Sequence, residues 1–346
     1  MRKSILTISP YSEISEIGRK SVTVCSNIHS IDSVRAVHKN AIDPTLGQNP
    51  KILIMNNSAA KKYDLCVQHV MPHLIAKVDI PTFSFYEPNS YGNQSFDSWL
   101  QCADSIVVRS EEQKKALSER VRQRAIVIPP SIDHGAKVGY KQVLDEFTFF
   151  VPNGKYNGNN ADVLMAYLME FGQEESVRLG IMSANPQATI DEIHALKTGM
   201  CLYAKDLFPE IKIYTDIATM MNEGCCCIDV VSSLSYQPTT LLSMAQGSPS
   251  IMLKNSCLAE WMPEELYYPV ESYRDVCKFT ENRPIEIQPA RCEIHYPIVK
   301  SIRQQMRKAY EDRLGFLSKQ KKIRKSLLDI FGQEKFEKEF KEKICS

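Results

Sequence analysis

Two side chains that can hydrogen-bond a hydroxyl or accept its proton stand where predicted strands end. Residues 63–70 (YDLCVQHV) and 82–86 (TFSFY) have the short apolar pattern of buried strands; His69 lies at the end of the first, and Glu87 follows the second. Successive parallel strands end at one edge of a sheet, so we expect both side chains to face one site. Either could orient a substrate hydroxyl or act as its general base.

A second set of polar residues follows a predicted strand in the other half of the chain. Residues 147–151 have the pattern of a strand, and Asn153, Gly154 and Lys155 come next, ahead of a helix predicted over 160–171. A helix N-terminus presents free N–H groups and partial positive charge, so a lysine on a glycine-containing loop beside it suits a phosphate.

A third set surrounds the start of a helix predicted over residues 239–246, which Gly247 ends. Thr239 and Thr240 supply hydroxyls and free backbone N–H groups there. Gln237 and Ser243 are further polar candidates at this position.

The elements that must position these residues alternate between strands and helices. The clearest unit is residues 102–133, with an apolar strand at 105–108 and a second at 125–128. Ser110 between them is an expected N-cap, and Gln113 completes a capping box. This is a βαβ crossover, which predicts an α/β fold with a mainly parallel sheet.

Other elements follow the same alternation. Strands are predicted at residues 3–9, 21–26, 51–55, 176–182, 211–214, 226–231 and 250–253. Helices are predicted at residues 32–40, 95–103 and 189–207, and from about residue 297 the chain is nearly all helical.

The length of 346 residues favours two domains. A polar segment with two glycines, residues 134–145, is the expected linker. We predict a first Rossmann-like domain over 1–140, a second over 141–315, and C-terminal helices over 316–346 that pack back toward the first domain. The default ligand site is the cleft between the two domains.

Charge is balanced overall but uneven along the chain. Net charge is +1, yet from Lys300 onward there are 14 Lys or Arg against 7 Asp or Glu. Solvated helices are the favoured interpretation of this basic end, and contact with phosphates of DNA, lipid or nucleotide is the alternative.

The eleven cysteines have no disulfide-like spacing, which favours a reducing cytoplasm. The consecutive residues 225–227 are expected to be apolar core residues, because adjacent side chains of a strand face opposite sides and could not all reach one metal. No signal peptide and no membrane span is expected.

Several segments resemble the GT-B glycosyltransferases of the retaining "glycosyl transferases group 1" family. In that family an Asp opens a strand ending in Ser, a helix follows, and the next strand ends in Pro-x-x-x-Asp; here these are Asp104, Ser110, Pro129 and Asp133. Further likenesses in family order are YDLCVQHVMP, FSFYEP, SWLQCAD, VPNGKYNGNNADVLMAYL, CIDVVSS…TTLLSMAQGSPSIML and HYPIVKSIRQQMRKAYED. The resemblance spans about residues 64–312.

The resemblance implies two Rossmann-like domains facing across a cleft. The first would bind the acceptor, for which DNA, a glycan and a lipid-linked sugar all stay open. The second would bind a nucleotide-diphosphate sugar, with a UDP-sugar the expected donor and no metal or other cofactor required. The implied roles are catalytic for Glu87 and His69, donor-binding for Lys155, Asn153, Gly154, Gln237, Thr239, Thr240 and Ser243, and acceptor-side for Tyr11 and Arg109.

The chain departs from the family pattern on the donor side. The family pairs two Glu residues eight positions apart around ribose and sugar, and Leu234 and Leu242 stand at those positions here. Two further hypotheses therefore stay open. One is a phage-type enzyme that glycosylates hydroxymethylated DNA bases. The other is a non-catalytic binding protein with a degenerate donor site. A basic amphipathic end could also lie on an anionic membrane.

Overall fold

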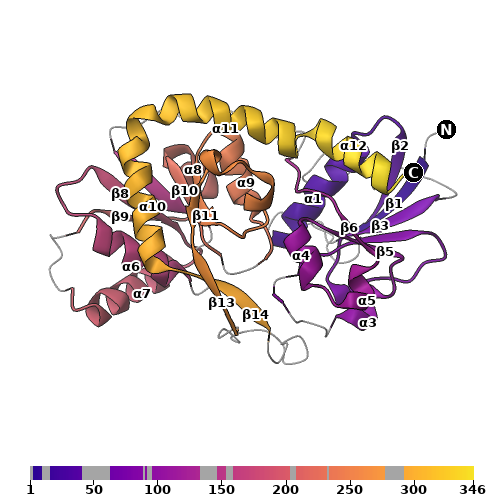
Figure 1. Cartoon of the computed structure of the whole chain (residues 1–346), viewed down its shortest axis with the longest axis horizontal. Coiled ribbons are helices and arrows are strands. Elements are labelled where there is room, and N and C mark those ends of the chain that lie inside the picture. The colour runs from indigo at the N-terminus through magenta and orange to yellow at the C-terminus, as the bar shows by residue number, and fades with distance from the viewer. Residues whose placement is uncertain are drawn as a thin grey trace.

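The computed structural model describes residues 3–9, 16–40, 63–88, 90–91, 96–132, 146–152, 159–202, 208–231, 234–276 and 292–346. Two α/β domains lie side by side (Figure 1). The long helix α11 (Phe316–Phe331) runs along the top of the second domain, and α12 (Gln333–Lys343) continues over the first. Predictions for other residues, including the strand at 51–55 and the linker at 134–145, fall outside the described part.

The first domain is built on a parallel six-stranded sheet with the order β2-β1-β3-β4-β5-β6. Its strands are β1 (Lys3–Ser9), β2 (Val34–Asn40), β3 (Leu65–Gln68), β4 (Thr82–Phe85), β5 (Ser105–Val108) and β6 (Ala125–Val127). Its helices are α1 (Glu16–His29), α3 (Asp97–Leu100), α4 (Glu111–Ala116) and α5 (Glu119–Arg122).

The second domain repeats this plan with the order β12-β11-β10-β7-β8-β9, again all parallel. Its strands are β7 (Phe147–Val151), β8 (Val177–Met182), β9 (Ile211–Tyr214), β10 (Cys226–Asp229), β11 (Ser250–Leu253) and β12 (Tyr268–Val270). Its helices are α6 (Asn159–Glu170), α7 (Pro186–Gly199), α8 (Ile217–Glu223) and α9 (Pro238–Ala245). The predicted α/β fold class is therefore confirmed.

The strands form where short apolar runs can be buried on both faces. All five residues of β7 (FTFFV) are buried, and the cysteines at 225–227 are buried beside them.

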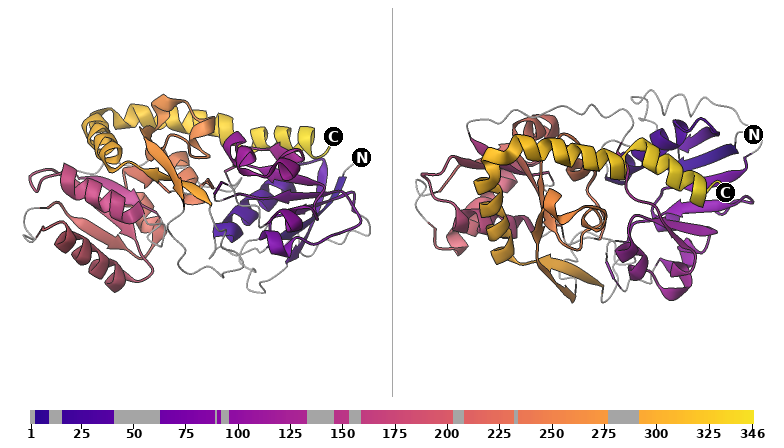
Figure 2. Two further views of the ribbon diagram at one scale, coloured as in Figure 1. Left: turned by 60° about the horizontal axis from the view of Figure 1, so that its bottom comes forward. Right: turned by 45° about the horizontal axis from the view of Figure 1, so that its top comes forward.

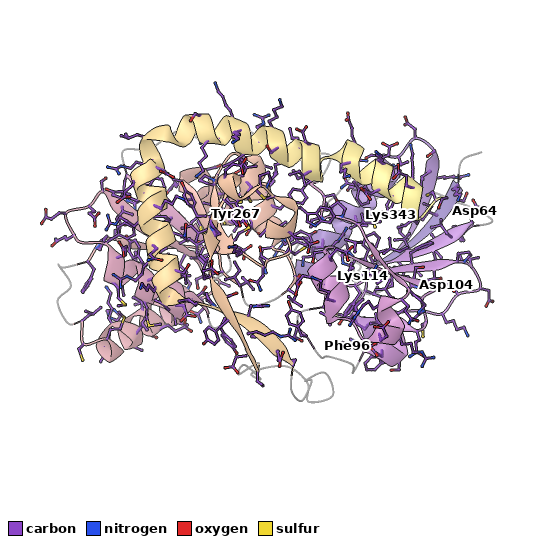
Figure 3. The ribbon with its side chains drawn as sticks, in the orientation of Figure 1. Asp64, Phe96, Asp104, Lys114, Tyr267 and Lys343 are labelled. Carbon is purple, nitrogen blue, oxygen red and sulfur yellow. The ribbon has the colours of Figure 1, made fainter. Side chains whose placement is uncertain are left out.

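Two carboxylates lie at the amino ends of strands in the first sheet, Asp64 just before β3 and Asp104 just before β5 (Figure 3). Asp64 accepts a hydrogen bond from the backbone N–H of Ser4 (2.7 Å), and Asp104 accepts one from that of Thr82 (2.7 Å). Asp104, part of the family pattern, thus has a structural role before β5.

Two predictions at the start of the chain were wrong. Residues 21–26, predicted as a strand, belong to α1, and residues 32–40, predicted as a helix, contain β2. The alternating pattern SVTVCS misled because α1 is buried on nearly every side, by the first sheet and by the C-terminal helix α12 (Gln333–Lys343). Burial of this kind overrides the β propensity of Val and Thr.

Other elements differ in length or were missed. The helix predicted over 95–103 is the single turn α3, and that predicted over 189–207 is α7. Helix α8 and strands β12, β13 (Ser272–Val276) and β14 (Glu293–Pro297) had no counterpart in the predictions. The N-cap at Ser110 is confirmed, since the Gln113 backbone N–H donates to the Ser110 hydroxyl at 3.1 Å. The reciprocal half of the capping box differs, because the Gln113 side chain accepts from the backbone N–H of Arg109 (2.7 Å), one residue before the N-cap.

The C-terminal helices connect the two domains. Helix α10 (Val299–Glu311) packs on α6, and α11 then crosses to the first domain, where α12 lies against the sheet (Figure 2). Phe336, Phe340 and Ile344 enter the core of the first domain. Lys343, labelled in Figure 3, donates to the Val127 carbonyl at 2.7 Å. The end of the chain therefore belongs physically to the first domain.

The antiparallel pair β13–β14 reaches from the second domain to the first. Tyr91 of the first domain and Glu293 exchange backbone hydrogen bonds of 2.9 and 3.2 Å. The Tyr91 hydroxyl donates to Glu112 (2.5 Å), and Arg274 lies 3.8 Å from the Tyr91 ring centre. The β13–β14 pair is therefore one of the contacts that hold the two domains together.

Candidate functional site

The sheet topology identifies the edge at which a ligand is expected. The strand order reverses direction between β1 and β3 in the first sheet and between β7 and β10 in the second. In open parallel sheets, ligands bind outside the carboxyl ends of the strands at such reversals. His69 directly follows β3 at the first reversal. Asn153, Gly154 and Lys155 follow β7 at the second, and they lie outside the described residues.

His69 is buried beneath this edge, with 3% of its surface exposed. Its backbone N–H donates to the Ile8 carbonyl of β1 (3.0 Å), and its ring lies 5.9 Å from that of Phe85. The ring atom Nδ1 makes no hydrogen bond within the described part of the chain. Burial lowers the pKa of His69 to about 3, against the attraction of Glu87, so the imidazole is neutral at physiological pH.

Glu87 follows β4 and is the centre of a buried ionic cluster. Its carboxylate accepts hydrogen bonds from Lys20 Nζ (2.5 Å) and Ser235 Oγ (2.6 Å), and its Oε1 lies 3.5 Å from Arg109 Nε. The Glu87 side chain is 8% exposed. Burial would raise the pKa of this carboxyl, but the nearby Lys20 and Arg109 cations outweigh it and hold the pKa below its usual value.

Arg109 follows β5 and is fully buried. Its guanidinium lies 4.5 Å from the Phe85 ring centre, and Nη1 donates to the Pro129 carbonyl at 3.3 Å. The Trp261 indole of the second domain donates to its backbone carbonyl at 2.8 Å. Nη2 has no hydrogen-bond partner among the residues described. His69, Glu87 and Arg109, the ends of three adjacent strands, therefore converge. Tyr11, the other acceptor-side candidate, lies outside the described residues.

One segment of the second domain, residues 234–237 just before α9, packs against this cluster. Gln113 Nε2 donates to the Leu234 carbonyl at 3.0 Å, and Lys20 Nζ lies 4.6 Å from the centre of the Tyr236 ring. Beside it, the carboxylate of Glu260 accepts the backbone N–H groups of Glu111 (2.7 Å) and Glu112 (3.1 Å). The candidate site is therefore shared between both domains.

The donor-side candidates around α9 differ in how far they can reach a ligand. Gln237 is the N-cap residue and 4% exposed, and Thr239 is half-buried at the helix start. Thr240 is fully buried with its hydroxyl 3.8 Å from Cys227 Sγ of β10, and Ser243 is fully buried as well. Gly247 ends the helix with φ of 91°, as predicted. Thr239 is thus the best placed of the three hydroxyls.

The two positions where the family resemblance expects Glu are both packed in apolar surroundings. Leu234 is buried against Tyr91 and Ala116 at the domain junction. Leu242 packs on the cluster that includes Phe150 and Tyr214. Neither position offers a carboxylate to a sugar.

Sequence reasoning missed Lys20 and Ser235. Lys20 directly precedes the stretch that was predicted as a strand, so its side chain had no predicted direction. A lysine next to the apolar run SVTVCSNI is a usable signal, because a buried ammonium requires an anionic partner. Ser235 carried no such signal, since its partner Glu87 lies 148 residues away.

His69 is expected to make the free energy of unfolding depend on pH below about 6.5. In the unfolded chain it gains a proton near its ordinary pKa of 6.5, whereas in the fold it stays neutral down to about 3. The contribution of neutral His69 to folding stability is therefore fully present above pH 6.5. It is lost as pH falls below that value, by up to about 1.4 kcal/mol per pH unit. Urea unfolding at pH 7 and pH 5 should show a loss about 2 kcal/mol larger for wild type than for His69→Gln. The exposed His73→Gln variant should keep the wild-type slope.

The described residues include no helix long and apolar enough to cross a membrane. Within the same ranges, no group of three or more His, Cys, Asp or Glu side chains is arranged to hold a metal ion.

Comparison with known proteins adds the fold family. No family model and no curated protein matches the chain by sequence. Among solved structures, Anabaena HepE in complex with UDP-glucose matches with a TM-score of 0.62 at 12% identity, covering 99% of both chains. A glycosyltransferase from Rickettsia africae matches at 0.61 and 11% identity, over 99% of this chain and 97% of that one.

Sucrose-phosphate synthase from Thermosynechococcus elongatus matches over 99% of this chain and 98% of its own, with a TM-score of 0.60 and 14% identity. These likenesses span both domains and the C-terminal helices. The fold is therefore the GT-B arrangement of two Rossmann-like domains, as the sequence resemblance implied.

Proposed function

We propose that this protein is a glycosyltransferase that moves a sugar from a nucleotide-diphosphate sugar to an acceptor hydroxyl. The observation that carries the proposal is the convergence of His69, Glu87 and Arg109 at the carboxyl edge of the first sheet, directly against the segment that starts α9. On this basis we assign the strand ends of the first sheet to the acceptor and the start of α9 to the donor.

The donor diphosphate is assigned to the second domain. Lys155, Asn153 and Gly154 follow β7 at the reversal of strand order, and the start of α9 presents backbone N–H groups beside Gln237 and Thr239. Negative charge develops on the departing diphosphate, and a cation with helix N–H groups stabilises it. A UDP-sugar is the expected donor; the HepE comparison structures contain UDP or UDP-glucose.

The acceptor hydroxyl is assigned to the first domain. His69 Nδ1, Glu87 Oε1 and Arg109 Nη2 all lack hydrogen-bond partners among the described residues, although each is buried. A hydroxyl could donate to Glu87 and accept from Arg109. The low pKa values of Glu87 and His69 make both weak bases, so we assign them the role of orienting the hydroxyl rather than removing its proton.

A screen of UDP-, GDP- and CMP-sugars by thermal shift and by donor hydrolysis tests this assignment. We expect UDP-sugars to raise the melting temperature and to be hydrolysed slowly in the absence of acceptor. Absence of both stabilisation and turnover with every donor would overturn the enzyme assignment and leave a GT-B-like binding protein.

Duplex DNA is a second candidate acceptor, and a group of exposed lysines on α11 favours it. Lys321, Lys322 and Lys325 are exposed on α11, although Lys322 also approaches Glu265 at 3.5 Å. A patch of this kind meets a phosphate backbone with an affinity that falls steeply with salt. Binding to a duplex with hydroxymethylated bases, measured at low and moderate salt, decides the matter. No binding at low salt removes DNA as the acceptor.

A further inference from the structure

We propose that Lys20 is a positioning residue that latches the second domain onto the first through Glu87 and Ser235. The latch is defined here as these three side chains together with Tyr236. Its geometry stands on its own, and its effect on turnover rests on the proposed function.

One ammonium group contacts both domains. Lys20 lies on α1, is 3% exposed, and its Nζ is 2.5 Å from both Glu87 Oε2 of the first domain and Ser235 Oγ of the second. Ser235 Oγ in turn lies 2.6 Å from the same Glu87 oxygen, which closes a triangle of three polar atoms. The Tyr236 ring is the fourth member, 4.6 Å from the ammonium.

The two cations beside Glu87 have different tasks. Arg109 approaches Oε1 at 3.5 Å and is anchored within the first domain by Phe85 and the Pro129 carbonyl. It can keep the carboxylate ionised, whereas its side-chain hydrogen bond and ring contact both lie within the first domain. Lys20 approaches the other oxygen and reaches that segment directly. Lys20 is therefore the cation whose loss should affect the junction more than the first domain.

The latched segment leads straight into the proposed donor site. Ser235 and Tyr236 immediately precede Gln237, the N-cap residue of α9, and Pro238, its first residue. Because two residues separate the Ser235 hydroxyl from the helix start, holding Ser235 against Glu87 also sets where α9 begins. Lys20 thus connects the proposed acceptor-side carboxylate to the segment that begins the proposed donor-side helix.

Hydrogen exchange and solution scattering of the full chain test the latch without any substrate. For Lys20→Met we expect amides of residues 238–246 to exchange about 10–100-fold faster, as for the loss of one or two charged hydrogen bonds. The radius of gyration should increase. Lys20→Arg should stay near wild type, Ser235→Ala should fall between, and the exposed Lys77→Met is the matched control, with no change expected.

A kinetic measurement gives the same latch a functional readout. Lys20→Met should lower kcat about tenfold or more and leave the KM for the donor within about threefold, because donor contacts lie on the second domain. Unchanged exchange and scattering in both Lys20→Met and Ser235→Ala would overturn the latch. If Lys20→Met does not fold, Ser235→Ala decides alone, since it removes a hydroxyl and no charge. Lack of turnover in wild type would count against the proposed function only.

Discussion

The Glu87→Gln variant is expected to lose about 3–5 kcal/mol of folding stability, which is the usual effect of removing one partner from a buried ion pair. The substitution keeps the shape of the side chain but leaves Lys20 and Arg109 facing a neutral amide. Their side chains are 4% and 0% exposed, so water cannot replace the lost carboxylate. Urea unfolding at pH 7 measures the loss as a lower midpoint.

A double-mutant cycle separates the ion pair from general damage. Adding Lys20→Met to Glu87→Gln removes one of the unpaired cations. The double variant should therefore lose less folding stability than the sum of the two single variants, by about 0.5–3 kcal/mol. Glu119→Gln, at a carboxylate that is 70% exposed, is the matched control and should change stability by no more than about 0.5 kcal/mol. A loss below about 1 kcal/mol in Glu87→Gln would show that the cluster contributes little to the fold.

The Lys155→Ala variant is expected to lose turnover almost completely, by a factor on the order of 10²–10³, which is the usual effect of losing one group that stabilises charge in the transition state. Lys155 follows β7 in the sequence and precedes α6, and we assign it to the proposed diphosphate. Stability should change by no more than about 0.5 kcal/mol, because the role proposed for Lys155 is in holding the diphosphate and not in the fold.

Steady-state rates with the best donor of the screen measure this effect, and unfolding midpoints provide the stability comparison. Lys300→Ala, at an exposed lysine of α10, is the control and should keep wild-type rates. A near-normal rate for Lys155→Ala would show that the diphosphate is held by other groups.

The proposed roles of His69 and Glu87 are narrower than those that a strand-end position alone allows. Both could be general bases as far as sequence is concerned. In the structure, burial lowers the pKa of His69, and the Lys20 and Arg109 cations keep the pKa of Glu87 low despite its burial. These environments favour groups that hold a hydroxyl in place. The pKa of a side chain depends on its neighbours in space, which sequence does not list.

Local patterns were sufficient where the local signal and the tertiary environment agree. The apolar runs of β5 and β7, the N-cap at Ser110 and the glycine end of α9 were all predicted at the correct positions. Each depends on residues within a few positions of one another, through side-chain period, a cap hydrogen bond or a left-handed φ. The parallel α/β class follows from them.

Tertiary structure decided what the local pattern could not. Residues 21–26 alternate like a strand, yet α12, more than 300 residues later, helps to bury the same segment as a helix. Helix α1 directs Lys20 at Glu87, and Ser235, 215 residues after Lys20, completes the cluster. The strand ends could be named from sequence because they are local features. Their partners required the fold, because ion pairs and buried hydrogen bonds form between surfaces that meet only after the domains assemble.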